Sequence, residues 1–327
     1  MRCIYLIMFK KKIGMIGLGS WGKNIYRSLN YFNVVELVYD NDLKNLNFNL
    51  VDKNKITKNI DDLFLSKKID SIVISSPAIT HKDYIIRSLI NNKNVFVEKP
   101  LCLSLKDARE VEKVANKFKK VVFTGHLLQY HNAFRELKQN IKLGKIGHLQ
   151  IIKANRLNFG AVRKIESVLY DLASHDLSMI LSIADKLPVK VDVNAVFKNS
   201  KTIPDYMNII LYFKKNLTAI LNVDWISPYK EHRFSVFGSK GSLIFDDTEN
   251  WKNKLIFNPS YLNKKNEVVY KPNVSILIQE EEPLRKEIES FLNCIQYGET
   301  PVTDIKEAIN VQIVLNKIEN KLIKKYG

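Results

Sequence analysis

The stretch IGMIGLGSWGKN, residues 13–24, constrains the fold of this chain more than any other segment. An apolar run typical of a buried strand leads into three glycines, Gly17, Gly19 and Gly22, and a helix-forming segment follows at once. The spacing G-x-G-x-x-G between a strand and a helix is typical of a dinucleotide-binding turn. Alone the spacing is weak, because glycines serve tight turns everywhere.

The residues around the glycines strengthen this interpretation. Asp40 ends the next predicted strand, about 20 residues after the glycines, where the dinucleotide pattern carries its acidic residue. A carboxylate there accepts hydrogen bonds from the ribose hydroxyls and repels a 2′-phosphate, so we predict NAD rather than NADP. The loop residues Leu18, Ser20 and Trp21 are predicted to contact the cofactor, whose pyrophosphate lies at the helix N-terminus. The alternative for Asp40 is a solvated loop residue.

The hydrophobic pattern changes once along the chain, near residue 125. Before it, apolar runs rich in Val, Ile and Phe alternate with amphipathic segments, which is typical of a parallel sheet covered by helices. After it, pairs such as MNIILYF and LTAILNVDW indicate hairpins. We predict an α/β chain, with a doubly wound Rossmann domain over residues 1–125 and an α+β domain with an open, mostly antiparallel sheet over 126–327. Apolar stripes over 284–295 and 308–322 predict two final core-packing helices.

Composition excludes several classes of protein. The chain has 327 residues, of which 46% are hydrophobic and 26% charged, as in globular proteins. No apolar run approaches the roughly 20 residues of a membrane span. The net charge of +17 comes from scattered lysines without an arginine-rich block, so we interpret it as solvated surface charge rather than a nucleic-acid surface. The alternative is a field that attracts an anionic substrate.

The cysteines and the first residues bear on location. Cys3, Cys102 and Cys294 are far apart and lack metal-type spacing, which favours a reducing cytoplasm and no metal site. The opening MRCIYLIMF is followed by KKK without a small-residue cleavage site, so we interpret it as an extension of the first strand. Either Met1 or Met8 can be the start.

A second motif, Glu98-Lys99-Pro100, ends the predicted strand NVFVE. Open α/β sheets place their ligand crevice at such strand ends, and Pro100 stops the strand. A lysine there can hold a substrate hydroxyl, or lose its proton if it is desolvated. The alternative is a surface salt bridge followed by a turn, and local chemistry does not choose between the two.

A third motif is YDLASHDLSMI, residues 170–180. Asp171 and His175 are four residues apart, hence on one face of a predicted helix. A histidine beside a carboxylate suits the removal of a hydroxyl proton as hydride leaves the same carbon. The alternative is a structural histidine, and Asp176 is expected to cap or pair.

These motifs together resemble the glucose-fructose oxidoreductase, inositol dehydrogenase and MocA (Gfo/Idh/MocA) family, and the resemblance covers nearly the whole chain. SSPAITH at 75–81 is similar to the family's nicotinamide-side loop, and GKIGHLQ at 144–150 to the start of its substrate domain. The resemblance implies a Rossmann domain, a substrate domain whose open sheet often forms an oligomer interface, and NAD(P)-linked oxidation of a sugar or polyol. A homo-oligomer, dimer or tetramer, is therefore expected.

The resemblance also implies residue roles. Lys99 matches the family's catalytic lysine, His175 its active-site histidine and Asp171 its substrate-binding aspartate. Ala173 stands where glycine is frequent, and Asn132 where proline is frequent; neither change removes a functional group. The remaining residues expected beside the cofactor are Ser76, Pro77, His81 and Glu98.

Longer segments resemble one branch of the family. TGHLLQYHNAF, NRLNFG and DWISPYKEHRFSVFG are similar to dehydrogenases that oxidise C3 of UDP-N-acetylglucosamine or its glucuronate form. Four basic residues are expected to meet the substrate, because guanidinium and ammonium groups suit phosphates and carboxylates: Arg156, Arg163, Lys230 and Arg233. His131 is expected to contact the substrate because its segment is predicted to line the cleft. Two alternatives stay open: a dehydrogenase of a free polyol or monosaccharide, and a non-catalytic NAD-sensing module on the same fold.

Overall fold

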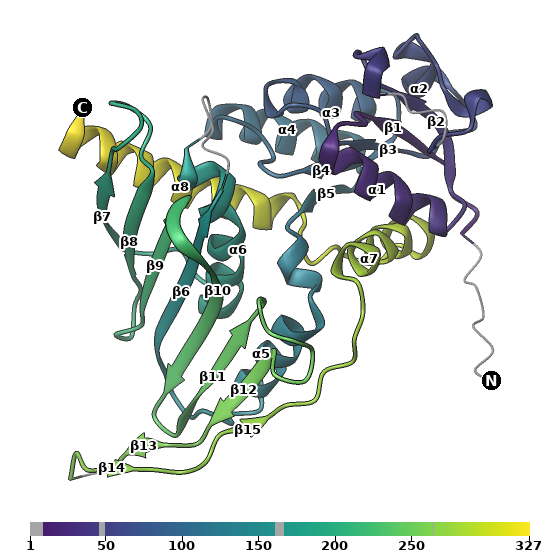
Figure 1. Cartoon of the computed structure of the whole chain (residues 1–327). Helices are drawn as coiled ribbons and strands as arrows, with labels where there is room; N and C mark the ends of the chain where they lie inside the picture. Colours follow the sequence, from purple (N-terminus) through teal and green to yellow (C-terminus); the bar gives the residue numbers. More distant parts are fainter. Residues whose placement is uncertain (1–8, 46–49, 161–166, 264) are drawn as a thin grey trace, which may run out of the picture. The chain divides into compact units, whose positions relative to one another are not determined.

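The computed structural model describes residues 9–45, 50–160, 167–263 and 265–327 (Figure 1). The chain divides into two compact units. The first comprises Met1–Leu127 and Glu282–Gln312, and the second Leu128–Glu281 and Ile313–Gly327. The first break lies close to the predicted boundary after residue 125. Residues 282–312 belong to the first unit, whereas the sequence predicted them as part of the second domain. Local sequence patterns do not show this assignment, because it depends on contacts between distant segments.

The first unit contains a parallel sheet with strand order β2-β1-β3-β4-β5. Strands β1 and β3 are buried along their whole length, which explains their apolar sequences. The order reverses between β1 and β3, where doubly wound sheets bind their ligands. This sheet confirms the predicted Rossmann fold. The strands are β1 Ile13–Ile16, β2 Val35–Tyr39, β3 Ser71–Ile74, β4 Asn94–Glu98 and β5 Val122–Gly125; the helices between them are α1 Ser20–Tyr31, α2 Asp61–Leu65, α3 His81–Ile90 and α4 Leu105–Phe118.

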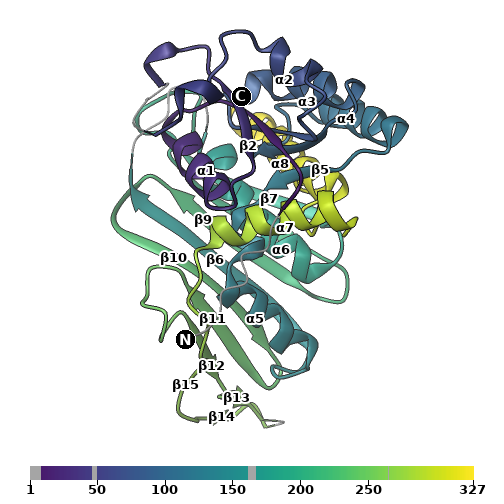
Figure 2. The same cartoon turned by 90° about the vertical axis from the view of Figure 1, so that its right-hand side faces the viewer.

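Helix α7 (Pro283–Tyr297) joins this unit from the far end of the chain. It lies beside α1 in both views (Figures 1 and 2). Its Phe291 ring centroid lies 5.6 Å from that of Phe96 on β4 and 5.5 Å from that of Phe123 on β5. The apolar stripe predicted over 284–295 is therefore core packing against the parallel sheet.

The second unit contains a sheet with strand order β15-β12-β11-β10-β6-β9-β8-β7, antiparallel except for the β6–β9 pair. The predicted hairpins are β8–β9 and β10–β11, so the mostly antiparallel sheet is confirmed. On β8 buried and partly exposed residues alternate, as in a sheet with one covered face. The strands are β6 Leu149–Phe159, β7 Lys190–Val196, β8 Tyr206–Tyr212, β9 Thr218–Asp224, β10 Ile226–Gly238, β11 Gly241–Asp246, β12 Leu255–Asn258 and β15 Val274–Ser275, with a separate ribbon of β13 Tyr261–Leu262 and β14 Val268–Val269.

The helices of the second unit are α5 (Asn132–Lys142), α6 (Ser174–Ala184) and the later part of α8 (Ile305–Tyr326), which begins in the first unit. No helix in the described ranges is long and apolar enough to cross a membrane. Cys102 and Cys294 are buried free thiols. Predictions on Met1, Cys3, Met8 and Arg163 fall outside the described residues.

Candidate active-site residues

The glycine turn after β1 needs two of its glycines for steric reasons. Gly17 has a φ of +95°, and a Cβ there would lie 2.8 Å from the backbone of Ser75. A Cβ on Gly22 would lie 2.4 Å from the carbonyl oxygen of Gly17. A Cβ on Gly19, in contrast, would meet no atom within 4 Å. Gly17 and Gly22 therefore build the turn, while Gly19 leaves open space of the kind that a pyrophosphate needs.

The N-terminus of α1 fits an anion. Gly19 is the N-cap and gives no side-chain hydrogen bond to the first amides, and the first turn, with Ser20 and Trp21, holds no acidic residue. The first N–H groups of such a helix, together with its dipole, bind phosphate well. Ser75 Oγ donates a hydrogen bond to the carbonyl oxygen of Gly17 at 2.7 Å and fixes the turn. Sequence reasoning missed Ser75, although it adjoins the predicted Ser76.

Asp40 braces the glycine turn from within. Its Oδ2 accepts a hydrogen bond from the amide of Leu18 at 2.6 Å. Its Oδ1 accepts from the amide of Asp42 at 2.8 Å and from Asn45 Nδ2 at 3.2 Å. Only 6% of Asp40 is exposed, so the alternative of a solvated loop residue is wrong. A carboxylate has about four acceptor sites, and three of them are filled, which leaves room for a ribose hydroxyl.

His81 connects the loop after β3 with the loop after β4. It is buried, with Nδ1 2.8 Å from the carbonyl oxygen of Pro100 and Nε2 2.9 Å from that of Ser76. The Pro77 carbonyl oxygen accepts from the amide and hydroxyl of Thr80, which closes the loop before α3. His81 thus holds the predicted nicotinamide-side loop against the segment that follows Lys99.

Glu98 connects this segment to the glycine turn. Its Oε1 accepts a hydrogen bond from Trp21 Nε1 at 2.7 Å. On the neighbouring strand it pairs in register with Gly125, where a Cβ would lie 3.2 Å from its carboxyl group. Burial raises the pKa of Glu98, while the Trp21 bond and the charge of Lys99 oppose this rise. The first unit therefore brings all of the predicted cofactor residues together around one linked set of loops.

Asp171 and His175 belong to the second unit. Leu169–Ala173 forms a π-helical turn that runs directly into α6, whereas the sequence predicted one regular helix. Both side chains are partly exposed and stand one turn apart. Because π turns often mark functional sites, this irregularity agrees with a role for Asp171.

The basic candidates of the second unit differ in setting. Arg156 is buried and pairs with both carboxylate oxygens of Asp176, through Nε at 2.5 Å and Nη2 at 3.2 Å. This setting favours a structural role over ligand contact. Arg233 pairs with Asp246 at 2.9 Å, but half of its side chain is exposed. Lys230 is exposed.

His131 lies in a closed network. Its Nδ1 accepts from the amide of Ala133 and caps α5, and its Nε2 lies 3.4 Å from Asp247 Oδ1. The ring stacks on Trp251 with centroids 5.2 Å apart, and only 2% of His131 is exposed. Burial alone raises the pKa of Asp247, but the bond from His131 and the charge of Lys254 lower it to about 2. Like Arg156, His131 therefore has a setting that favours a structural role.

His232 was not predicted as a site residue. It pairs in register with Arg156 across β10 and β6, beside Lys230 and Arg233. Burial and then the charges of Arg156 and Lys230 lower its pKa to about 4, so the ring is neutral at neutral pH. The signal available in the sequence was the histidine of EHRF, which lies in the segment DWISPYKEHRFSVFG that resembles the family.

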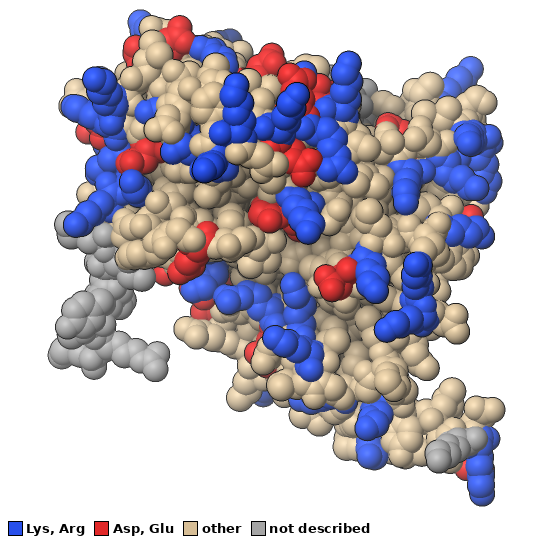
Figure 3. Space-filling model, turned by 180° about the vertical axis from the view of Figure 1, so that it is seen from behind, with Lys and Arg blue, Asp and Glu red and all other residues tan. Residues whose placement is uncertain are grey.

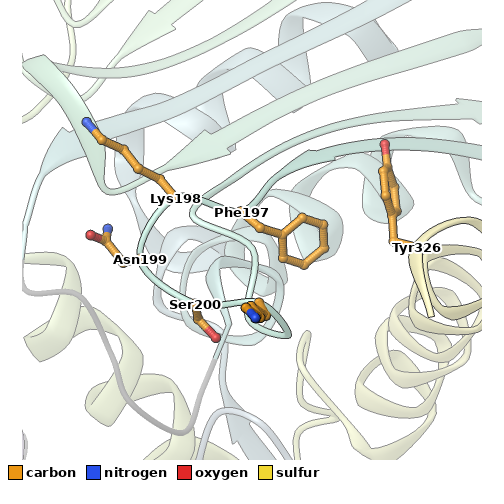
Figure 4. Close-up of a pocket in the computed structure, with 6 residues that line it drawn as sticks. Phe197, Lys198, Asn199, Ser200 and Tyr326 are labelled. Atoms are coloured by element: carbon orange, nitrogen blue, oxygen red, sulfur yellow. The ribbon is translucent and has the colours of Figure 1, made fainter.

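A cavity of about 400 Å³ lies elsewhere in the second unit, between the β7–β8 loop and the end of α8 (Figure 4). Among its described lining residues is none of the predicted site residues. No group of three or more His, Cys, Asp or Glu in the described part of the chain is arranged to hold a metal ion. The residues lining the cavity are Phe197, Lys198, Asn199, Ser200, Lys201 and Tyr326.

Two family models match this chain. The model described as "Oxidoreductase family, NAD-binding Rossmann fold" matches residues 11–126. The model described as "GFO/IDH/MocA C-terminal domain" matches residues 134–244. The chain belongs to the Gfo/Idh/MocA family.

Relatives in this family carry several substrate names. The scyllo-inositol 2-dehydrogenase (NAD(+)) of Bacillus subtilis is 25% identical over 257 residues, which are 75% of this chain and 73% of that protein. The myo-inositol 2-dehydrogenase of Thermotoga maritima is 22% identical over 89% of this chain and 90% of its own length. A structure of UDP-N-acetylglucosamine 3-dehydrogenase from Acidithiobacillus ferrooxidans superposes with a TM-score of 0.83 at 19% identity, covering 96% of this chain and 98% of that one. The last likeness shows the fold.

As a Gfo/Idh/MocA protein, the chain is an oxidoreductase that uses a nicotinamide dinucleotide and acts on a small molecule. The glycine turn, the uncapped α1 N-terminus and the open space at Gly19 fit such a cofactor. Lys and Arg side chains are spread over one face with Asp and Glu side chains among them (Figure 3), which agrees with solvated surface charge.

Proposed function

We propose that this protein is an NAD-dependent dehydrogenase that oxidises a sugar hydroxyl to a ketone, at C3 of UDP-N-acetylglucosamine or its glucuronate form. The observation that carries the dehydrogenase part of the proposal is the 2.7 Å hydrogen bond from Trp21 Nε1 to Glu98 Oε1. It ties the helix that binds the pyrophosphate to the residue before Lys99. Lys99 is thereby held at a strand end beside the cofactor loop, where a reacting group is useful.

The proposed chemistry divides between the cofactor and the chain. When bound, NAD supplies the hydride acceptor. His175 is proposed to take the proton of the reacting hydroxyl, and Asp171 to accept a hydrogen bond from a neighbouring hydroxyl and orient the ring. Lys99 is proposed as the catalytic lysine that the family resemblance implies. Lys230 and Arg233 are solvent-accessible cations that suit a diphosphate or carboxylate. The buried settings of Arg156 and His131 favour structural roles.

The second candidate is a dehydrogenase of a free polyol, and a specific observation favours it. The two inositol dehydrogenases named above align over three quarters or more of this chain. The sugar-nucleotide candidate is supported by the segment resemblances and by the shared fold. A non-catalytic NAD sensor is a third candidate, and the presence of Lys99, Asp171 and His175 together argues against it. Either enzyme is proposed to act as a homo-oligomer in the cytoplasm.

A substrate panel separates these candidates. Purified protein is incubated with NAD and, separately, with UDP-N-acetylglucosamine, its glucuronate form, free N-acetylglucosamine, myo-inositol and scyllo-inositol. Enzyme is used in single-turnover amounts, because ketone formation is unfavourable at equilibrium. Reduced nicotinamide, with loss of two hydrogens from a UDP-sugar alone, supports the first candidate. Product from an inositol moves the assignment to the second, and NAD binding without any product favours the sensor.

Asp40 is expected to set the preference for NAD. In Asp40→Ser the ratio of NADP to NAD dissociation constants should fall by about 10- to 100-fold, because one charge-assisted hydrogen bond and the repulsion of a 2′-phosphate are lost. The control is Asp42→Ser, an exposed carboxylate two residues away that should leave the ratio unchanged. Calorimetric titration of both cofactors measures the ratio. An Asp40→Ser protein that keeps the wild-type ratio would show that Asp40 only braces the turn.

A further inference from the structure

A pair of carboxyl groups lies where α7 covers the parallel sheet. Phe96 and Phe123 pair in register on β4 and β5, and two residues further along the same strands Glu98 pairs with Gly125. Alternate residues of a strand share a face, so Glu98 lies on the face that Phe96 presents to α7. Phe291 of α7 packs on both phenylalanine rings. Glu287, one helical turn earlier, therefore meets the sheet near Glu98.

Glu287 is a buried carboxyl group with one unpaired oxygen among the described residues. Only 1% of it is exposed, and among the described residues its Oε1 has no hydrogen-bond partner. Burial, followed by the nearby charge of Glu98, raises the pKa of Glu287 well above its ordinary value. An ionised carboxylate in this place would be both desolvated and next to a like charge, which proteins avoid by holding a proton.

Three groups near the pair stabilise a negative charge on Glu98. Trp21 of α1 donates its indole N–H to Glu98. Lys99, which follows β4, and His126, which follows β5, both attract the Glu98 carboxylate. His126 already has a partner, because its Nδ1 lies 2.7 Å from Glu307 Oε2. Lys99 is thus one of the charges that act on the Glu98 carboxylate.

We propose that Glu287 is a positioning residue that keeps one proton on the Glu98–Glu287 pair, so that a single negative charge acts on Lys99. The relevance to catalysis rests on the proposed function of Lys99, whereas the proton count stands without it. A second ionised carboxylate would double the negative charge that the pair presents to Lys99. Glu287 thus tunes the group that is proposed to assist removal of the hydroxyl proton.

The proton count is tested by unfolding the full chain in urea between pH 5 and 8. The unfolded chain releases the Glu287 proton above the ordinary glutamate pKa of 4.5, and the folded chain keeps it, so wild-type stability falls as pH rises toward the raised folded pKa. Glu287→Gln holds no such proton. The folded-to-unfolded ratio of the wild type should therefore fall, relative to Glu287→Gln, by up to about tenfold per pH unit.

Glu289→Gln is the matched control, since Glu289 lies on the same helix and pairs with Lys286 at 2.9 Å. It should follow the wild-type pH dependence. Parallel curves for wild type and Glu287→Gln would overturn the proposal. Should Glu287→Gln fail to fold, carbon NMR of the wild type labelled in its glutamate carboxyls decides: one glutamic acid signal still protonated at pH 7 supports the proposal, and none overturns it.

The effect on Lys99 is measured without the reaction. In protein labelled at lysine Cε, the Lys99 signal is identified by its loss in Lys99→Ala. At pH 7 this signal should stay at its wild-type position in Glu287→Gln, because glutamine is neutral like a protonated Glu287. It should move in Glu98→Gln, because the single charge of the pair is then removed. A Lys99 signal that moves in Glu287→Gln, or that stays in place in Glu98→Gln, would overturn the claim that one charge of the pair acts on Lys99. Absence of turnover on every sugar would instead count against the proposed function alone.

Discussion

Replacing Lys99 with alanine is expected to abolish turnover while NAD still binds. Proton transfer by a positioned side chain contributes about 10²- to 10⁴-fold, so kcat should fall by roughly 10³-fold. The glycine turn and its braces, Asp40 and Ser75, do not involve the Lys99 side chain. The NAD dissociation constant should therefore stay within about twofold, which corresponds to about 0.4 kcal/mol.

Lys106→Ala is the control for this prediction, because Lys106 is an exposed lysine at the start of α4. It should behave as wild type in turnover and in NAD binding. Initial rates of NAD reduction and calorimetric titration measure the two quantities. A Lys99→Ala protein with full activity would remove Lys99 from the mechanism.

Alanine substitutions at two glycines of the same turn are expected to have different effects, one on NAD affinity and the other on stability. In Gly19→Ala the new methyl group meets no atom of the folded chain, so stability should change by less than about 1 kcal/mol. The methyl group fills the space that the pyrophosphate approaches, so NAD affinity should fall by about 10- to 100-fold. In Gly22→Ala the methyl group would lie 2.4 Å from the Gly17 carbonyl oxygen, and the fold itself should lose about 3 kcal/mol.

Thermal unfolding without cofactor, together with NAD titration, separates the two effects. Gly19→Ala should melt as wild type and bind poorly, whereas Gly22→Ala should melt several degrees lower. Each variant thus serves as the control for the other. Wild-type NAD affinity in Gly19→Ala would contradict the placement of the dinucleotide at this turn.

The predictions from sequence that the structure confirms depend on local patterns. The parallel sheet could be read from short apolar runs separated by helical segments, and the antiparallel sheet from hairpin pairs such as β8–β9. The steric demands at Gly17 and Gly22 come from the tight turn between β1 and α1, which the glycine spacing indicates. Such features need no knowledge of distant contacts.

Features set by distant contacts could not be predicted. Glu287 reads as an ordinary helical glutamate until α7 packs on the parallel sheet. One signal was present, since Glu287 falls at core spacing between Leu284 and Phe291 on the apolar stripe. His131 looked available to a substrate, but its stacking on Trp251 closes it off. Burial of these side chains depends on partners more than a hundred residues away.

The central claim is hydride transfer from a sugar carbon to NAD, and one isotope measurement tests it most directly. UDP-N-acetylglucosamine deuterated at C3 is incubated with the enzyme and NAD in single-turnover amounts, and the reduced cofactor is analysed by mass spectrometry. The account predicts one deuterium on the nicotinamide ring and a ketone at C3 of the sugar. Reduced cofactor without deuterium would place oxidation at another carbon, and absence of any reduced cofactor would contradict the claim for this substrate.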